Sequence, residues 1–319
     1  MPVVDMSLDK LKTYMGCTPR PADFDEFWDR SIAEADALDT DAVFVPHPFA
    51  SKIADCFDLY FTGTKGARIH ARVTVPKNVT GKVPAVLHFH GLSGASEKFR
   101  NLLAFAGQGF VTASMDCRGQ GGVSEDVGGV AGTTYTTPFT RGLDGAPEGF
   151  LMRDVFLDTY LLAKIIMARP DVDETRVGVY GGSQGGALSL VCAALMPSVK
   201  ICCAVYPYLS DYKRVWAMDL TKVAYEGLRY YFRHFDPTHA HEEEFFTKLG
   251  YIDVQNLAPR IRAKVRMATG LMDTTCPPST QFAAYNKITA EKEVVIYPDF
   301  DHEDLRGEDD AIFETLSQL

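Results

Sequence analysis

The sequence predicts an α/β fold with a mostly parallel central sheet flanked by helices. Six short apolar runs lack alternation and are typical of strands covered by helices on both faces: 85–89, 110–114, 177–180, 201–205, 265–269 and 294–297. Segments of helical pattern lie between them, at 102–108, 153–168, 184–195 and 280–287, which indicates a series of strand-helix-strand units. Two alternating segments, 56–61 and 69–75, predict an antiparallel hairpin at the front edge.

The length favours one domain over residues 1–319 with two additions. The 319 residues, 46% of them hydrophobic, are enough for one large core. Residues 1–40 predict an N-terminal helical extension, since Phe24, Phe27 and Trp28 recur at helical spacing. Residues 210–260 form a connection far longer than usual and are rich in aromatic side chains. We expect a helical cap over the carboxyl edge of the sheet; the alternative is an outer helical layer that does not contact substrate.

Charge and composition limit the classes of binding partner and the cellular compartment that we expect. The net charge of −10 argues against nucleic acid or an anionic membrane surface and favours a neutral small molecule. No apolar run approaches membrane-span length and the first residues do not resemble a signal peptide, so we expect a cytoplasmic protein. Seven cysteines without a CxxC pair indicate free thiols of a reducing compartment.

A glycine-rich turn follows the strand at 177–180. Gly181-x-Ser183-x-Gly185 fits a nucleophile elbow, in which a serine occupies a strained turn and the flanking glycines leave room for close backbone contacts. An ordinary glycine-rich turn that carries a serine is the alternative. The strand before it and the apolar segment after it favour the elbow, and with it an α/β-hydrolase architecture.

A serine nucleophile requires a histidine base and a carboxylate that orients the histidine. In the α/β-hydrolase arrangement they follow in the order serine, acid, histidine, each after a sheet strand. Asp273 follows the strand at 265–269 and His302 follows the strand at 294–297, so we predict both as partners of Ser183. Asp299 and Asp301 are alternatives for the acid. We interpret the nearby Cys276 as a small buried side chain.

The tetrahedral intermediate needs donors for its oxyanion. We expect the backbone N–H of Gln184, directly after the serine, and that of Leu92, in the loop after the strand at 85–89. We expect His90 to shape that loop. The mechanism needs no metal or other cofactor, and we interpret His239 and His241 as part of a solvated charged segment. The glycine-rich residues 119–150 predict a long irregular loop with a functional role.

Several segments resemble carbohydrate esterase family 7, the acetyl xylan esterases and cephalosporin-C deacetylases. The resemblance extends over nearly the whole chain. Its most specific parts are Arg118-Gly119-Gln120-Gly121 and His302-Glu303; the others are Phe24-Asp25-Glu26-Phe27-Trp28, Gly181-Gly182-Ser183-Gln184-Gly185-Gly186, Gly270-Leu271-Met272-Asp273, 251–260 and 277–283.

The resemblance implies an α/β-hydrolase that removes acetyl groups from small acetylated xylo-oligosaccharides and cephalosporin C without a metal. It assigns Ser183 as nucleophile, His302 as base, Asp273 as orienting acid, and the N–H groups of Leu92 and Gln184 as the oxyanion hole. It also implies a homohexamer whose sites face an internal cavity, and structural roles for Arg118 and Gln120. The family usually has a tyrosine where this sequence has Leu92, so one side chain that lines the acyl site differs.

Two other functions remain open from the sequence. An α/β-hydrolase that acts on other short-chain esters or on amides, as a peptidase or a dienelactone-type hydrolase, uses the same three residues. A catalytically silent sugar-binding protein on this fold would retain the aromatic side chains and lose the triad. The presence of Ser183, Asp273 and His302 favours an enzyme.

Overall fold

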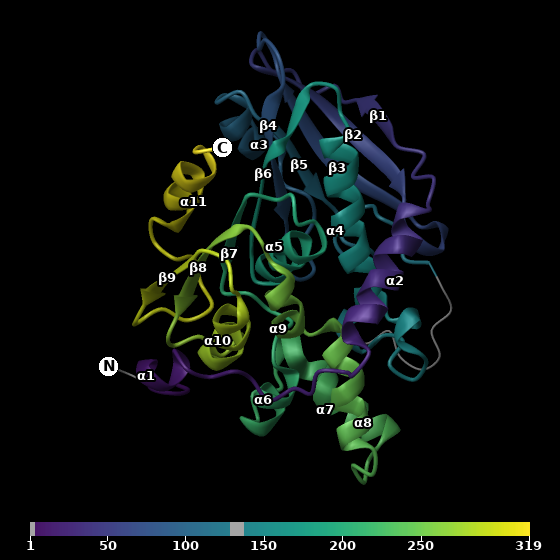
Figure 1. Cartoon of the computed structure of the whole chain (residues 1–319), viewed down its shortest axis with the longest axis vertical. Coiled ribbons are helices and arrows are strands. Elements are labelled where there is room, and N and C mark those ends of the chain that lie inside the picture. The colour runs from purple at the N-terminus through teal and green to yellow at the C-terminus, as the bar shows by residue number, and fades with distance from the viewer. Residues whose placement is uncertain (1–3, 128–136) are drawn as a thin grey trace.

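The computed structural model describes residues 4–127 and 137–319. Within them, nine strands form one sheet in the order β1-β2-β3-β5-β4-β6-β7-β8-β9 (Figure 1). The pairs β1/β2, β2/β3 and β3/β5 are antiparallel, and the pairs from β5/β4 to β8/β9 are parallel. The mostly parallel sheet is therefore confirmed. The strands are β1 (Val43–Pro46), β2 (Ala54–Thr62), β3 (Arg68–Pro76), β4 (Val83–Phe89), β5 (Val111–Met115), β6 (Val172–Gly182), β7 (Ile201–Val205), β8 (Lys264–Gly270) and β9 (Lys292–Tyr297).

Helices cover both faces of this sheet, as expected for an α/β-hydrolase. They are α1 (Leu8–Leu11), α2 (Phe24–Asp36), α3 (Phe99–Ala106), α4 (Leu151–Met167), α5 (Gln184–Leu195), α6 (Tyr212–Ala217), α7 (Glu226–Phe235), α8 (Glu242–Leu249), α9 (Val254–Leu257), α10 (Pro278–Lys287) and α11 (Glu308–Leu316). Helix α5 packs on β4, β6 and β7, whereas α3 packs on β3 and β5 and α11 packs on β7.

The alternation of side chains along β4 separates two cores. Leu87 belongs to the large core that also holds residues of α4 and α5. Val86 belongs to a smaller core with Phe105 of α3 and Ile312 of α11. Because successive side chains of a strand point to opposite faces, α5 and the α3/α11 pair lie on opposite sides of the sheet.

Three elements differ from the sequence-based expectation. Strand β1 and helix α11 were not predicted; β1 has four residues, which is too short for a clear pattern, and α11 follows the last predicted strand. Strand β9 was expected to be buried on both faces, but its six residues are half-buried or exposed. It lies at the end of the strand order, so β8 is its one neighbour in the sheet.

The N-terminal residues form two helices and an extended strap between them. Trp28 of α2 is fully buried and stacks on Phe156 of α4 with ring centroids 5.8 Å apart, so the apolar stripe predicted for this helix is its packing face. The strap is held by Asp211, whose Oδ1 accepts the backbone N–H groups of Cys17 and Thr18, both at 2.9 Å.

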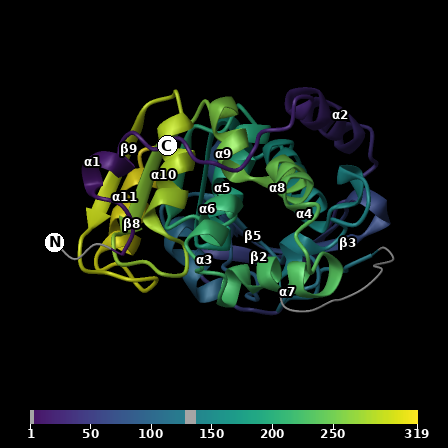
Figure 2. The same ribbon diagram turned by 90° about the horizontal axis from the view of Figure 1, so that it is seen from below.

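Residues 210–260 include α6, α7, α8 and α9, which lie in the lower part of the view in Figure 1 and are seen from below in Figure 2. Their aromatic side chains pack largely on one another: the Tyr231 and Phe245 ring centroids are 4.2 Å apart, and those of Trp216 and Phe232 are 4.7 Å apart. Gly227 of α7 lies against Thr137, where an added Cβ would be 1.9 Å from the threonine Oγ1. Helix α7 therefore packs against the part of the 119–150 loop that contains Thr137.

Two further expectations concern the chain as a whole. All seven cysteines are free, in agreement with the absence of a disulfide framework. Across residues 4–127 and 137–319, no helix combines the length and the apolar character that a membrane crossing requires. The predicted irregular loop at 119–150 is described in part, because residues 128–136 lie outside the described residues.

Candidate active site

Ser183 occupies a sharp turn between the end of β6 and the start of α5. Its φ of 56° and ψ of −119° are unusual for a residue with a side chain, and its N–H is bound by the Val205 carbonyl at 2.9 Å. A Cβ at Gly181 would lie 2.4 Å from the Phe89 carbonyl oxygen, and one at Gly185 would lie 1.9 Å from it. The two glycines therefore let the turn pack against the end of β4, which is what a nucleophile elbow requires.

His302 and Asp273 form a hydrogen-bonded chain with Ser183. His302 Nε2 lies 3.0 Å from the Ser183 Oγ, and His302 Nδ1 lies 2.8 Å from the Asp273 Oδ2. Asp273 follows β8 and His302 follows β9, so the parallel register brings both loops to the same edge of the sheet as the elbow. This is the geometry of nucleophile, base and orienting acid.

Asp273 is held so that one oxygen remains for the histidine. Its side chain is fully buried, and its Oδ1 accepts the N–H groups of Thr275 at 2.9 Å and Cys276 at 2.7 Å. Gln281 donates to Oδ2 at 3.3 Å. These donors fix the direction from which the carboxylate contacts His302.

The alternative acid Asp301 has a different role. Its Oδ1 accepts the backbone N–H groups of Thr274 at 2.9 Å and His302 at 2.8 Å. It therefore joins the two loops that carry Asp273 and His302, while the His302 ring bonds to Asp273. Asp299 is exposed.

Two loops that flank the serine are tied together by glutamine side chains. The Oε1 of Gln120 accepts the Ser93 N–H at 2.8 Å, and the side-chain amides of Gln120 and Gln184 pair reciprocally at 2.9 and 3.1 Å. Gln184 is the first residue of α5, and Leu92 lies in a turn closed by the Gly94 N–H on the Gly91 carbonyl at 3.0 Å. Gln120 thus connects the two segments that carry the predicted oxyanion donors.

His90 shapes the turn before Leu92. Its Nε2 accepts the Cys117 N–H at 3.0 Å, so Nδ1 carries the hydrogen and donates to the Gly91 carbonyl at 2.7 Å. Both ring nitrogens are engaged, and burial lowers the pKa of His90. Its position agrees with the structural interpretation.

Arg118 is buried and binds a helix. Its Nε and Nη2 contact the two oxygens of Asp158 in α4 at 2.5 and 2.7 Å, and its Nη1 donates to the Thr64 carbonyl at 3.0 Å. The bidentate pair anchors the loop that presents Gln120.

A further side chain at the site was not predicted. The ring centroids of Tyr206 and His302 are 4.4 Å apart, and Tyr206 adopts a positive φ of 32°. Tyr206 directly follows β7, and a position after a core strand at this edge is the one sequence signal that points to it. The ring limits the positions that the imidazole can take.

Asp273, Cys276 and His302 are residue types that can bind a metal ion, and they lie close together. One ligand atom each of Asp273, Cys276 and His302 lie within 4.8 Å of one another. The carboxylate and both imidazole nitrogens already bond within the Ser183 chain, and burial raises the pKa of the Cys276 thiol well above its usual value. The arrangement therefore fits the triad with a protonated, buried thiol beside it. His239 and His241 lie next to Glu242 and Glu244 at the molecular surface.

A pocket of about 280 Å³ adjoins the oxyanion turn. It is lined by Leu92 and Ser93, by residues 118–121, and by Thr137, Pro138, Arg141 and Leu151. Among the described residues, the buried Thr137 Oγ1 and Arg141 Nε have no hydrogen-bond partner. Buried polar atoms are normally satisfied. The Thr137 Oγ1 lies against Gly227 of α7, which leaves the Arg141 Nε as the unpartnered donor beside the pocket.

The chain is similar to known esterases over its whole length. A model of the family described as acetyl xylan esterase matches residues 1–319. Acetyl esterase Axe7A of Xylanibacter ruminicola is 33% identical over 311 residues, which cover 94% of this chain and 66% of that protein. This chain thus spans just under two thirds of the length of that curated relative.

Solved structures give the same picture. Acetyl xylan esterase 1 from Thermoanaerobacterium sp. JW/SL YS485 is 51% identical, with a TM-score of 0.97 over 98% of this chain and 99% of that chain. Acetyl xylan esterase from Paenibacillus sp. R4 is 33% identical, with a TM-score of 0.93 and the same coverage. The acylaminoacyl peptidase of Pyrococcus horikoshii, at 16% identity and a TM-score of 0.58 over 83% of this chain and 40% of that chain, shares the fold alone.

Proposed function

The chain belongs to the acetyl xylan esterase family of carboxylic-ester hydrolases, and from that premise we propose that it removes acetyl groups from small acetylated carbohydrates through an acyl-enzyme. The observation that carries the proposal is the chain of hydrogen bonds from Ser183 Oγ through His302 to Asp273, at 3.0 and 2.8 Å. Acetylated xylo-oligosaccharides are the proposed substrates. Cephalosporin C, whose acetyl ester is similarly small, is a second proposed substrate on the strength of the family resemblance.

Catalysis proceeds in two steps. Ser183 attacks the acetyl carbonyl while its proton passes to His302 Nε2, and Asp273 stabilises the imidazolium through Nδ1–H. The backbone N–H groups of Leu92 and Gln184 receive the negative charge of the tetrahedral intermediate. The sugar alcohol leaves with the proton from His302, and water then repeats the sequence on the acetyl-enzyme.

The pocket beside Leu92 supports a substrate that carries hydroxyl groups. The unpartnered Arg141 Nε offers a hydrogen bond to a sugar, while the Leu92 side chain supplies an apolar contact next to the oxyanion turn. Helix α7 packs on Thr137 through Gly227. In this proposal residues 210–260 act as a cap because they position the loop that carries Thr137 and Arg141. Their aromatic rings do not line the pocket.

The test is hydrolysis of p-nitrophenyl esters from acetate to octanoate by the wild type, Ser183→Ala and the control Ser198→Ala. Ser198 is exposed on the surface. We expect the wild type to act fastest on acetate, Ser198→Ala to match it, and Ser183→Ala to lose about 10⁴-fold or more in kcat. Retention of most activity by Ser183→Ala would refute the proposed nucleophile. A preference for octanoate, or faster cleavage of a p-nitroanilide, would replace the acetyl esterase by a longer-chain esterase or a peptidase.

A further inference from the structure

A second pocket lies on the other side of the sheet, between α3 and α11. Its volume is about 660 Å³, within the range of small-molecule sites. His88 of β4 and Tyr180 of β6 are register partners in the sheet and both line the pocket. His88 precedes Leu92 by four residues and Tyr180 precedes Ser183 by three. The two strands that end at the active site therefore also supply the floor of this separate pocket.

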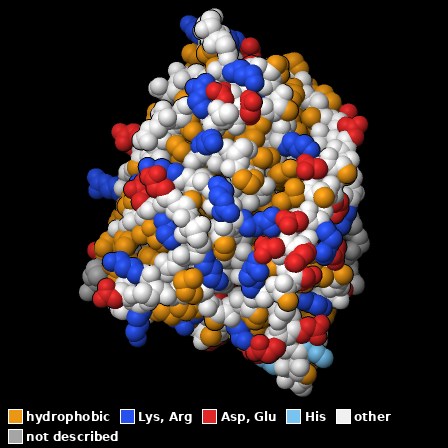
Figure 3. All heavy atoms as spheres, in the orientation of Figure 1, with side chains coloured by type: hydrophobic (Ala, Val, Ile, Leu, Met, Phe, Trp, Pro, Cys, Tyr) orange, Lys and Arg blue, Asp and Glu red, His pale blue; other side chains and the backbone are white. Residues whose placement is uncertain are grey.

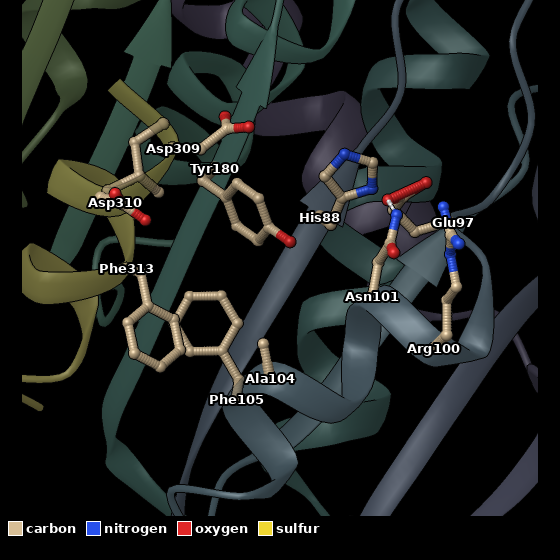
Figure 4. A pocket seen from close by; sticks show the side chains of 11 residues that line it. His88, Glu97, Arg100, Asn101, Ala104, Phe105, Tyr180, Asp309, Asp310 and Phe313 are labelled. Atoms are coloured by element: carbon tan, nitrogen blue, oxygen red, sulfur yellow. Dashed lines mark hydrogen bonds between the residues drawn. The ribbon is translucent and has the colours of Figure 1, made fainter. Parts of the chain in front are cut away.

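Aromatic rings form much of the pocket wall. The Tyr180 ring lies 4.9 Å from the His88 ring, 5.7 Å from Phe105, and the Phe105 ring lies 4.8 Å from Phe313 of α11. Figure 4 shows Tyr180 between the α11 side chains and those of α3, with its hydroxyl directed towards the side that carries Asn101 and Glu97. Half-buried rings of this kind offer flat apolar faces to a ligand.

Uncharged hydrogen-bonding groups accompany these rings. The Ser114 Oγ accepts the Glu97 N–H at 2.8 Å and lies 2.8 Å from His88 Nδ1, so Nδ1 of His88 is engaged with the serine. Burial lowers the pKa of His88 to about 4, and burial raises the pKa of Tyr180; both rings are neutral near pH 7. Among the described residues, no side chain is hydrogen-bonded to the Tyr180 hydroxyl.

The remaining lining residues are polar and mostly acidic. Glu97, Asp309 and Asp310 carry carboxylates, Asn101 carries an amide and donates to Glu97 at 2.5 Å, and Arg100 is the one cation among the lining residues. Three carboxylates against one guanidinium disfavour an anionic ligand such as a phosphate. On the face of the molecule shown in Figure 3, acidic and basic side chains are interspersed.

We propose that the pocket between α3 and α11 binds a neutral polyhydroxylated ligand, a sugar unit of the xylo-oligosaccharide class. Ring faces pack against the C–H face of a sugar, and carboxylate and amide oxygens accept hydrogen bonds from its hydroxyls. The Tyr180 hydroxyl donates to its oxygens, and His88 Nε2 forms one hydrogen bond with a hydroxyl, which can both donate and accept. An organic cation would satisfy the carboxylates and leave the Tyr180 hydroxyl without an acceptor for its hydrogen. The choice of sugar rests on the proposed function; the choice of a polyol rests on the pocket itself.

The test is calorimetric titration of the full-length protein with xylobiose, and with tetramethylammonium as a cation probe. The variants are Tyr180→Phe, which removes one hydroxyl, and Asp310→Asn, which removes one charge from the rim. Glu314→Gln is the matched control, because Glu314 lies on the exposed side of α11 and is not part of the pocket lining. Each variant is also assayed on p-nitrophenyl acetate.

We expect xylobiose to bind the wild type and Glu314→Gln equally, and to bind Tyr180→Phe and Asp310→Asn about three- to tenfold more weakly. Ester hydrolysis should be unchanged in all three variants. Xylobiose binding that is absent, or equal in every variant, would overturn the inference and leave the proposed function intact. Tetramethylammonium binding that is lost in Asp310→Asn, without xylobiose binding, would overturn it in favour of a cation site. Sugar binding by a wild type that hydrolyses no ester would support the pocket and refute the proposed function.

Discussion

At the scale of single residues, the two carboxylates near His302 bind different groups. Asp273 bonds to the ring Nδ1, whereas Asp301 bonds to backbone N–H groups of the same two loops. Both follow a core strand and both lie within a few residues of a predicted site residue. Their roles differ because one side chain is buried beneath the imidazole and the other faces the outside of the loop.

The two aspartates therefore predict unequal effects on kcat. In Asp273→Asn, an amide NH₂ facing Nδ1 favours the tautomer with the hydrogen on Nε2, which cannot accept the serine proton; kcat on p-nitrophenyl acetate should fall about 10³- to 10⁴-fold. In Asp301→Asn, the remaining oxygen still accepts backbone N–H groups, and the loss should stay below about tenfold. Equal losses in the two variants would contradict the assignment of Asp273.

At the scale of elements, the elbow depends on how closely β6, α5 and β4 approach one another. Gly185 packs directly on the Phe89 carbonyl, so the strained Ser183 conformation is maintained by contacts between segments about a hundred residues apart in the chain. A side chain at this position must displace backbone rather than another side chain. The strain and the close packing belong to the same turn.

Glycine substitutions test this packing. Gly185→Ala places a Cβ 1.9 Å from the Phe89 oxygen and should lower the free energy of unfolding by about 3 kcal/mol or more. Gly149→Ala is the control, since nothing lies within 4 Å of its added Cβ, and should change stability by less than about 1 kcal/mol. Urea denaturation measures both. A Gly185→Ala protein as stable as the control would show that the turn relaxes freely.

The N-terminal strap and α9 meet at a buried pair of carboxylates. Asp253 caps α9 by accepting the Gln255 N–H at 3.1 Å, and it accepts the Asp211 N–H at 3.0 Å. Asp211 in turn holds the strap at Cys17 and Thr18. Burial, with the neighbouring Asp211 charge, raises the pKa of Asp253 to about 7.

The raised pKa of Asp253 predicts that the free energy of unfolding decreases as the pH rises. Between the unfolded aspartate pKa of about 4 and the folded value of about 7, the folded state retains a proton that the unfolded state has released. The free energy of unfolding should therefore fall as pH rises from about 4 to 7. Urea denaturation at several pH values should show a shallower decrease for Asp253→Asn than for the wild type. Asp219→Asn, at an exposed site, should follow the wild type; the same slope in all three would refute the role of Asp253.

At the scale of the whole molecule, the family resemblance implies a hexamer with sites that face an internal cavity. Light scattering should then give a mass about six times the chain mass of 35.2 kDa. Acetate release from acetylated xylo-oligosaccharides should exceed release from polymeric xylan, because a polymer is too large to enter such a cavity. A monomeric mass, or equal rates on both substrates, would contradict this assembly.

The sequence by itself determined the fold class and the three residues of the hydrogen-bonded chain. Strand β7 has the predicted bounds, and each other predicted core strand agrees to within a few residues except for β6, which begins five residues earlier than predicted. Continuous apolar runs identify such strands because burial on both faces acts on every residue. Ser183, Asp273 and His302 could be predicted because each follows a strand, and parallel strands bring the residues after them to one edge of the sheet.

The tertiary structure alone decided which side chains meet across those loops. Three features combine residues from segments far apart in the chain. Tyr206 packs against His302, and Gln120 connects Ser93 with Gln184. The third feature is the pocket that His88 and Tyr180 line together with residues of α11. A local sequence pattern predicts the burial and periodicity of one segment. It does not predict which other segment packs against it. Strand β1 escaped prediction because its four residues are too few for a clear pattern. Helix α11 was not predicted either, although its Ile312 and Leu316 belong to the smaller core.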